Sequence, residues 1–285
     1  MKVSVITTVW NVAEWIEKNI KAFLNQTLKD SELILVNDCS PDNSLEIISK
    51  YNDPRIKVIN NPENLGPGVS RQIGLDNSIG EFTIFVDGDD WLEPDCLEVM
   101  YNEAISQDAD IVSCWSIQHN EYGLLPNKEV GYIYNKEDFY NFINNKLIKR
   151  YIWEKTHYSP LRFREDINTL FRCLEISKKT IKLKYCGYNY NLRPNSLTST
   201  PNIAGKSYLY NALAWIENIE WGKDKKCSMI YNRHFNLSNV NMLYHMGKAL
   251  LKDNISKYEN ECNQIEKYLK DNNYETKSWF NLWKK

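Results

Sequence analysis

The sequence lacks any uninterrupted apolar run of the roughly 18 residues that a membrane-spanning helix needs. Its first residues, Met1 and Lys2, lead directly into a short strand-like pattern, so we expect no signal peptide. The 7 cysteines include no Cys-x-x-Cys pair, and no Cys–His pattern has the spacing of a zinc site. Such a scattered, odd-numbered set is typical of reduced thiols, so we expect a cytoplasmic protein.

A strong net charge is also missing. The 285 residues carry 35 Lys and Arg against 37 Asp and Glu, which gives no electrostatic footprint for a nucleic acid. The composition, 42% hydrophobic and 25% charged, is typical of a globular protein with one large domain or a domain plus an appendage. Residues 205–285 hold a small basic excess, 13 Lys and Arg against 9 Asp and Glu, which would suit an anionic surface.

The first 115 residues alternate strand-like and helix-like patterns. Apolar, β-branched runs predict five strands, at Val3–Val9, Ser31–Asn37, Ile56–Asn60, Phe82–Val86 and Ile111–Trp115. Helical spacing predicts helices over Ala13–Asn25, Ser44–Tyr51, Val69–Ser78 and Pro94–Ser106. This alternation favours an α/β fold in which helices flank both faces of a mainly parallel sheet.

Polar side chains follow four of these strands, at Asn11, Asp38, Asn61 and Asp87. Parallel strands have their carboxyl ends at one edge of the sheet, and ligands bind in the crevice beyond that edge. We therefore expect these four side chains to line one ligand-binding crevice.

The most informative of these positions begins the acidic run Asp87-Gly88-Asp89-Asp90, directly after a buried strand. In strand geometry Asp87 and Asp89 point the same way, about 6–7 Å apart. Carboxylates that close raise each other's pKa unless a cation lies between them. All-oxygen ligands suit Mg²⁺ or Mn²⁺, which readily share a diphosphate. The run therefore indicates a metal-bound nucleotide, and the alternative is a solvated acidic turn.

The middle of the chain is less regular. Residues Tyr134–Arg150 are predicted to be helical, and Lys184–Leu192 form a Tyr-rich strand that ends before Arg193. The pair Glu165-Asp166 precedes an amphipathic run, which places both carboxylates near a helix N-terminus. The helix dipole favours negative charge there, which is a sufficient structural explanation for the pair.

Several motifs follow one another in order through residues 1–115. They are Val3-Ser4-Val5-Ile6-Thr7-Thr8-Val9-Trp10-Asn11, Gln26-Thr27, Leu35-Val36-Asn37-Asp38-Cys39-Ser40-Pro41-Asp42-Asn43-Ser44, Asn64-Leu65-Gly66, Ser70-Arg71-Gln72-Ile73-Gly74, Gly80-Glu81-Phe82, and Asp87-Gly88-Asp89-Asp90 with Pro94. A weaker set continues with Trp153-Glu154-Lys155, Phe163-Arg164-Glu165-Asp166, and Tyr190 with Arg193-Pro194-Asn195-Ser196-Leu197-Thr198. In order and spacing the chain resembles the family 2 inverting glycosyltransferases of bacterial glycan synthesis, which have the GT-A fold.

The resemblance implies a division of the chain. A GT-A catalytic domain would cover 1–203, with a nucleotide-binding half over 1–115 and an acceptor-side half over 116–203. Residues 204–285 match no motif of the family, and their apolar spacing predicts a helical C-terminal region. The expected helices there are Lys206–Ile219, Leu237–Leu251 and Ser256–Leu269.

The resemblance also implies roles for residues that bind the nucleotide. Asp38 corresponds to the carboxylate that accepts a hydrogen bond from the base, typically the N3–H of uracil. Thr8 and Trp10 lie in the segment that packs on the base. Arg71 corresponds to an arginine that helps hold the nucleotide, and Asp87 to the carboxylate near the ribose. The duller alternatives are a turn residue for Asp38 and an exposed helix residue with an i,i+4 partner for Arg71.

Two further roles concern the chemistry. The resemblance makes Asp89 the metal ligand, with Mn²⁺ or Mg²⁺ at the diphosphate, and Asp166 the general base that takes the proton of an acceptor hydroxyl. One displacement with one base inverts the anomeric centre. Glu165 and Arg193 are candidate contacts to the acceptor or the diphosphate, the alternative for Arg193 being a plain loop residue. Trp91 is either a stacking platform for a sugar ring or part of the core.

The sequence departs from the family pattern at three positions. Asn37 replaces the first residue of the usual Asp-Asp pair, Thr8 replaces a proline, and Trp10 replaces a tyrosine. These changes affect the geometry of base recognition, but none of them removes a charge that the chemistry needs. The four histidines are isolated, and we expect each to be structural; they are His119, His157, His234 and His245.

The resemblance implies transfer of a hexosyl or N-acetylhexosaminyl group from a UDP-sugar to a hydroxyl of a glycan or lipid-linked glycan. The acceptor would belong to lipopolysaccharide, lipooligosaccharide, capsule or a similar surface polysaccharide. One alternative is a non-catalytic nucleotide- or glycan-binding protein of the same fold. Another is a nucleotidyltransferase, which usually has a Gly-rich loop after its first strand; Trp10-Asn11-Val12-Ala13-Glu14 contains no glycine.

Three roles are open for the C-terminal helices. The end of the chain, Trp279-Phe280-Asn281-Leu282-Trp283-Lys284-Lys285, combines aromatic and basic groups that suit the inner surface of a cell membrane, where a lipid-linked acceptor would lie. Alternatively the helices pair between subunits, or they cap the catalytic domain, as amphipathic helices commonly do.

Overall fold

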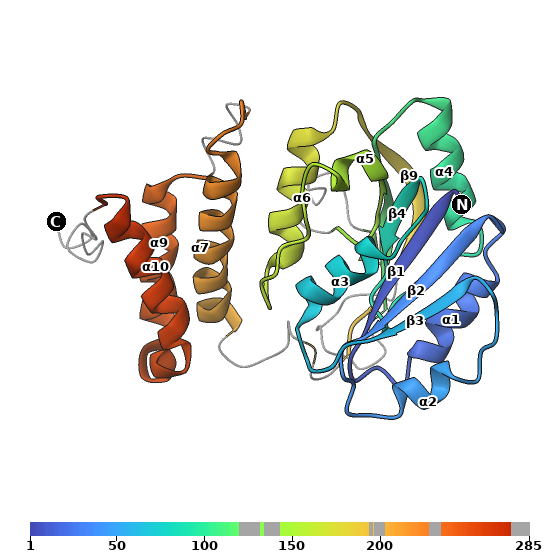
Figure 1. The fold of residues 1–285 in the computed structure, drawn as a ribbon, viewed down its shortest axis with the longest axis horizontal. Helices are drawn as coiled ribbons and strands as arrows, with labels where there is room; N and C mark the ends of the chain where they lie inside the picture. Colours follow the sequence, from blue (N-terminus) through green and yellow to red (C-terminus); the bar gives the residue numbers. More distant parts are fainter. Residues whose placement is uncertain (120–131, 134–142, 194–195, 197–202, 228–234, 275–285) are drawn as a thin grey trace.

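The computed structural model describes residues 1–119, 132–133, 143–193, 196, 203–227 and 235–274. Its centre is one sheet with the strand order β3-β2-β1-β4-β8-β6-β9-β5, and β7 pairs with β6 beside this path (Figure 1). The strands are β1 (Val3–Val9), β2 (Ser31–Asn37), β3 (Ile56–Asn60), β4 (Phe82–Phe85), β5 (Trp91–Leu92), β6 (Ile111–His119), β7 (Tyr132–Ile133), β8 (Lys146–Lys149) and β9 (Thr180–Asn191).

Helices cover both faces of this sheet (Figure 1). Those of the first half are α1 (Ile16–Leu24), α2 (Ser44–Ile48), α3 (Pro67–Asp76) and α4 (Cys96–Ser106). The remaining helices are α5 (Arg150–Trp153), α6 (Glu165–Ile176), α7 (Ile203–Gly222), α9 (Leu237–Leu251), the 3₁₀-helix η3 (Lys252–Tyr258) and α10 (Glu259–Asp271).

The alternation of side chains along the strands builds two cores. Val5 of β1 points into the core with α1, α2 and α4, whereas Ile6 points into the core with α3, α5 and α6. β1 pairs in parallel with both β2 and β4, and β2 pairs in parallel with β3. The carboxyl ends of these four strands therefore meet at one edge, which confirms the α/β fold and the crevice-forming geometry expected from the sequence.

The second half of the sheet is mixed. β8 lies antiparallel between β4 and β6, and β5 pairs antiparallel with β9. The helix predicted over Tyr134–Arg150 is wrong at Lys146–Lys149, which is strand β8, while 134–142 lie outside the described residues. Leu147 and Ile148 are fully buried in the two cores on opposite faces of the sheet. A strand places successive side chains on opposite faces, which explains why this segment is a strand and not a helix.

The C-terminal helices α7, α9 and α10 pack around a hydrophobic core of their own, beside α6 (Figure 1). They confirm the predicted helical region, although the helix expected over Ser256–Leu269 begins as the 3₁₀-helix η3. In the described part of the chain, no helix combines the length and apolarity that crossing a membrane requires. The aromatic and basic end of the chain lies outside the described residues. All 7 cysteines fall within the described ranges, and none of them is in a disulfide.

Candidate functional site

The acidic run forms a tight turn between β4 and β5. The backbone N–H of Asp90 donates to the carbonyl of Asp87 at 2.9 Å. Asn19, from α1, donates through its side-chain amide to the carbonyls of Asp87 (3.1 Å) and Asp90 (2.9 Å). The turn is therefore held from outside by a buried amide, which the sequence gave no reason to single out.

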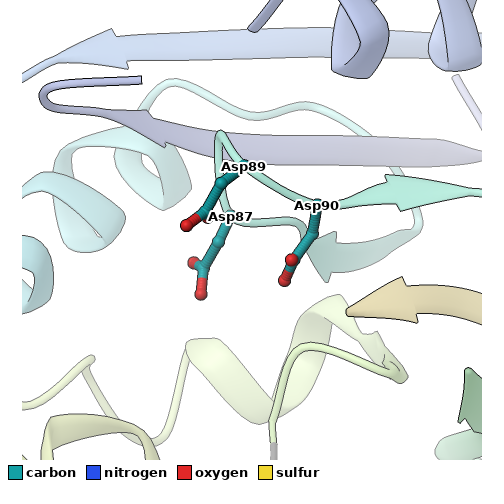
Figure 2. A group of neighbouring side chains, drawn as sticks. All are labelled: Asp87, Asp89 and Asp90. Carbon is teal, nitrogen blue, oxygen red and sulfur yellow. The ribbon is translucent and has the colours of Figure 1, made fainter. Parts of the chain in front are cut away.

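The carboxylates of this turn converge. One oxygen of each of Asp87, Asp89 and Asp90 lies within 4.8 Å of the others, and Figure 2 shows the three side chains leaving the turn toward the same side. Asp90 is buried, and its two oxygens accept hydrogen bonds from the Asn191 backbone N–H (2.8 Å) and from the Tyr188 hydroxyl. Burial and the neighbouring carboxylates raise its pKa well above the ordinary value. Asp90 thus anchors the turn to β9.

Asp89 faces a cation that comes from the end of β9. Arg193 donates from Nε to Asp89 Oδ2, and its guanidinium lies 5.1 Å from the centre of the Trp15 ring. Burial raises the pKa of Asp89, and the charge of Arg193 opposes that shift. Arg193 is therefore part of the carboxylate cluster rather than a plain loop residue.

Arg71 joins Asp87 to the second motif set. Its side chain, only 7% exposed, contacts Asp87 Oδ1 through Nη2 at 2.7 Å and Glu165 Oε1 through Nη1 at 2.6 Å. The ring of Tyr158 lies 5.4 Å from the guanidinium carbon. The alternative of an exposed helix residue is therefore wrong, because Arg71 is buried between two carboxylates.

Glu165 and Asp166 form the first turn of α6. Burial raises the pKa of Glu165 to about 7, although Arg71 opposes the shift. Asp166 is half-buried, and burial raises its pKa as well, against the positive charges of Arg71 and Arg164. The charge of Arg71 thus acts on Glu165 and Asp166 as well as on Asp87. The helix dipole alone would explain the two carboxylates at the start of α6 but not this link to Asp87.

Asp38, at the end of β2, organises the loop before α3. Its Oδ1 accepts from the Asn61 amide and from the Leu65 backbone N–H, both at 2.8 Å, and its Oδ2 accepts from the Gly66 N–H at 2.9 Å. Gly66 has φ +92°, a conformation that glycine adopts readily. Asp38 and Asn61 therefore lie together as predicted. The hydrogen bonds from the Leu65 and Gly66 backbone N–H groups to Asp38 were not predicted from the sequence.

The end of β1 lies on the same edge of the sheet. Thr8 is half-buried, whereas Trp10 keeps 43% of its surface exposed. The next residue, Asn11, has φ +54° and donates its backbone N–H to Ser40 Oγ at 2.8 Å. Trp10 is thus a large exposed aromatic beside the β2 end, which is the place expected for a group that packs on a base.

Trp91 packs against neighbouring elements. The ammonium of Lys18 lies 3.1 Å from the centre of its ring, and the His119 ring lies 4.6 Å away. His119 in turn is 2.8 Å from the side-chain carbonyl of Asn189. These contacts favour the packing interpretation of Trp91 and show a structural histidine, as expected for His119.

The cluster suits a hard divalent cation in its donor set. The ligand atoms that Asp87, Asp89 and Asp90 offer are all carboxylate oxygens, which Mg²⁺ and Mn²⁺ prefer. Because protein donors occupy both oxygens of Asp90, Asp89 and Asp87 are the members left to hold such an ion. Within the described residues, no other group of three or more acidic, His or Cys side chains has this geometry.

Comparison with known proteins identifies similar sequences. The sequence model of the family described as "Glycosyl transferase family 2" matches residues 4–171. The chain is 32% identical over 260 residues to a cholesterol galactosyltransferase of Borreliella burgdorferi, covering 82% of this chain and 72% of that protein. It is 31% identical over 219 residues to the glycosyltransferase GlyA of Streptococcus pneumoniae, covering 69% of this chain but 31% of GlyA.

Solved structures share the fold at lower identity. S. aureus TarS 1–349 in complex with UDP-GlcNAc superposes with a TM-score of 0.67 at 18% identity, covering 95% of this chain and 92% of that chain. The mannosyltransferase PcManGT of Pyrobaculum calidifontis, in complex with GDP-Man and Mn²⁺, gives a TM-score of 0.62 at 15% identity, covering 90% and 75%. Both likenesses support the GT-A fold.

Proposed function

The chain belongs to glycosyl transferase family 2, and we propose that this glycosyltransferase moves a sugar from a UDP-sugar to a hydroxyl of a glycan or lipid-linked glycan, with inversion at the anomeric carbon. The observation that carries the proposal is the buried Arg71, which contacts Asp87 on one side and Glu165 on the other. It joins the carboxylate turn and the start of α6 in one site. A bacterial surface polysaccharide, such as lipopolysaccharide, lipooligosaccharide or capsule, is the acceptor class we favour.

The donor would lie across the carboxyl ends of β1, β2 and β4. We assign base recognition to Asp38, with Thr8 and the exposed Trp10 packing on the base, and the ribose to Asp87. A UDP-sugar is favoured because TarS, which shares the fold, was solved with UDP-GlcNAc. Arg71 acts on the nucleotide by fixing Asp87, since its guanidinium already spans two carboxylates.

Asp89, with Asp87 beside it, would hold Mn²⁺ or Mg²⁺. When bound, the metal stabilises the negative charge that develops on the leaving diphosphate. The complex of PcManGT with GDP-Man and Mn²⁺ supports a divalent metal in this fold. Arg193, already next to Asp89, has a planar guanidinium suited to the diphosphate oxygens.

Asp166 is our candidate for the general base. The acceptor hydroxyl attacks C1 from the face opposite the diphosphate, and the carboxylate takes the hydroxyl proton as the new bond forms. The transition state carries positive charge on the sugar, which neighbouring carboxylates favour. Because burial raises the pKa of Asp166, its carboxylate is a stronger base than an exposed aspartate.

The proposal is tested by incubating the purified chain with a panel of nucleotide-sugars and Mn²⁺, then following the release of nucleoside diphosphate and the transfer of sugar. We expect a UDP-sugar to be consumed, and consumption to stop in Asp89→Ala. If no nucleotide-sugar is consumed with any acceptor, the chain is a non-catalytic binding protein of the same fold. We also propose a cytoplasmic location, which 7 cysteines in thiol form, outside any disulfide, support.

A further inference from the structure

A half-buried acidic side chain of the C-terminal helices reaches into the catalytic half. Glu217 of α7 forms an ion pair with Arg172 of α6, Oε1 to Nη1, at 2.9 Å. Its other oxygen accepts hydrogen bonds from the Asn168 amide (2.6 Å) and from the Ser159 hydroxyl (2.5 Å). The His157 ring nitrogen lies 3.4 Å from Oε1. One carboxylate therefore contacts both α6 and the loop that leads into it.

Charge and burial make this contact a strong one. Arg172 is fully buried, and a buried guanidinium without a counter-charge is strongly destabilising. Burial alone would raise the pKa of Glu217, but the nearby His157 ring, the charge of Arg172 and the hydrogen bond from Ser159 outweigh it and lower that pKa. Glu217 thus stays ionised at neutral pH and supplies the counter-charge that Arg172 needs.

The contact continues to the carboxylates of the proposed site. The Ser159 backbone N–H donates to Thr169 Oγ1 (2.9 Å), and the Thr169 hydroxyl donates to the carbonyl of Glu165 (2.7 Å). Glu165 is the residue that pairs with Arg71. From Glu217 to the first turn of α6 the path is therefore a chain of short hydrogen bonds among buried groups.

The same loop also touches the helix that carries Arg71. A Cβ atom on Gly68 of α3 would lie 2.0 Å from the Ser159 carbonyl oxygen, so the two backbones are in direct contact. The Tyr158 N–H donates to the Gln72 side chain at 2.6 Å. Both sides of the proposed site, α3 and α6, thus rest on the loop that Glu217 holds.

A second contact lies at the very start of α6. Arg164 precedes the helix with φ +64°, a left-handed conformation that is strained for a non-glycine residue. Its guanidinium donates to the Ser207 hydroxyl of α7 at 3.1 Å. α7 therefore contacts α6 both beside Asp166 and two turns further along.

We propose that Glu217 is a positioning residue for glycosyl transfer: acting through Arg172 and Asn168, it fixes α6 so that Asp166 faces the carboxylate turn. This inference rests on the proposed function, in which Asp166 is the base. It gives the C-terminal helices a direct part in the reaction, in addition to any contact with a membrane or a second subunit. Misplacing a catalytic group by about 1 Å can cost a hundredfold in rate.

The test compares Glu217→Gln with Glu220→Gln in the full chain. Glu220 lies on the same helix but contacts Lys223 (2.6 Å) and Tyr268 (2.5 Å) within the C-terminal helices. We expect Glu217→Gln to lower kcat by about tenfold to a hundredfold, with the Kd for UDP unchanged within about twofold. Glu220→Gln should match the wild type in both. A folded Glu217→Gln variant with wild-type kcat overturns the inference.

The pH profile separates positioning from loss of folded protein. Dividing each rate by the folded fraction measured at the same pH removes the effect of unfolded protein, whereas a loosened α6 exposes Asp166 and moves the apparent pKa of kcat down. We expect that downward shift, and an unshifted profile overturns the inference. If Glu217→Gln does not fold, the double variant Arg172→Met, Glu217→Met removes both charges and takes its place. In that variant wild-type kcat overturns the inference.

A third variant separates this inference from the proposed function. If Asp166→Asn keeps full turnover, the assignment of the base has failed, whatever Glu217→Gln does. If Asp166→Asn is inactive and Glu217→Gln is fully active, the base assignment stands and the positioning role is lost.

Discussion

Arg71 and Glu165 are joined by a buried ion pair of 2.6 Å across 94 positions of the sequence. The other arm of the same guanidinium holds Asp87 at 2.7 Å. This triad connects the turn after β4 to the first turn of α6, and it places one buried guanidinium between two carboxylates. The site is therefore one electrostatic unit, and changes in it affect stability as well as activity.

The first prediction concerns that unit. Arg71→Gln leaves the buried Glu165 and the half-buried Asp87 without their counter-charge, so we expect the free energy of unfolding to fall by about 3–5 kcal/mol. Urea denaturation followed by tryptophan fluorescence measures it. Arg55→Gln is the matched control, because Arg55 pairs with Asp53 at 2.9 Å with both side chains about a quarter exposed, and such pairs contribute about 1 kcal/mol or less. Equal losses in the two variants would contradict the buried role of Arg71.

A second prediction separates the roles of Asp89 and Asp90. Asp89→Ala should abolish Mn²⁺ binding, whereas the hydrogen bonds by which Asp90 anchors the turn stay in place. Asp90→Ala should instead leave the Tyr188 hydroxyl and the Asn191 N–H without their acceptor, which costs about 1–3 kcal/mol for each buried donor. Mn²⁺ titration measures metal binding by both variants, and thermal unfolding measures their stability. An Asp90→Ala protein as stable as the wild type would contradict the anchoring role of Asp90.

A third prediction concerns the cation next to Asp89. The guanidinium of Arg193 repels a second cation, so Arg193→Gln should bind Mn²⁺ more tightly than the wild type in the absence of nucleotide. The free Mn²⁺ signal in electron paramagnetic resonance measures this affinity. Arg150→Gln, which contacts the Gly80 carbonyl instead, should leave it unchanged. Weaker Mn²⁺ binding by Arg193→Gln would show that Arg193 supports the metal site.

Much of the first half could be predicted from the sequence. β1, β2 and β3 begin and end where apolar runs placed them. β1 and β2 are buried on both faces, and such strands read as continuous apolar segments. The acidic turn and Asp38 were likewise visible, since each directly follows a buried strand. The local sequence pattern was sufficient to predict those elements whose structure depends mainly on residues adjacent in the sequence.

The failures have a common physical cause. Lys146–Lys149 form β8 because they pair with β4 and β6. A local sequence pattern cannot predict pairing with strands so distant in the sequence. Arg71 was identified as part of the site, but its pairing with Glu165 depends on how α3 and α6 meet. Glu217 gave no signal at all, since a single acidic residue on an amphipathic helix resembles any exposed charge.

The pH dependence gives a fourth prediction. A base must be ionised, so activity falls as the pH falls through the pKa of Asp166, which burial raises above its ordinary 3.8. We expect kcat/KM for transfer to rise with pH, with an apparent pKa above that of an ordinary aspartate, reporting on Asp166 together with Glu165. Rates measured at constant ionic strength between pH 4 and 9 test this expectation, and a flat profile down to pH 4 would contradict it.

The most direct test of the account is the turnover of Asp166→Asn on its UDP-sugar, with the affinity for UDP measured on the same protein. Loss of a general base costs about a hundredfold to ten-thousandfold in rate, and the amide cannot take the proton. We predict a fall in kcat of that size with the Kd for UDP unchanged within about twofold. A kcat within twofold of the wild type would contradict the assignment of Asp166 and, with it, the mechanism proposed for this site.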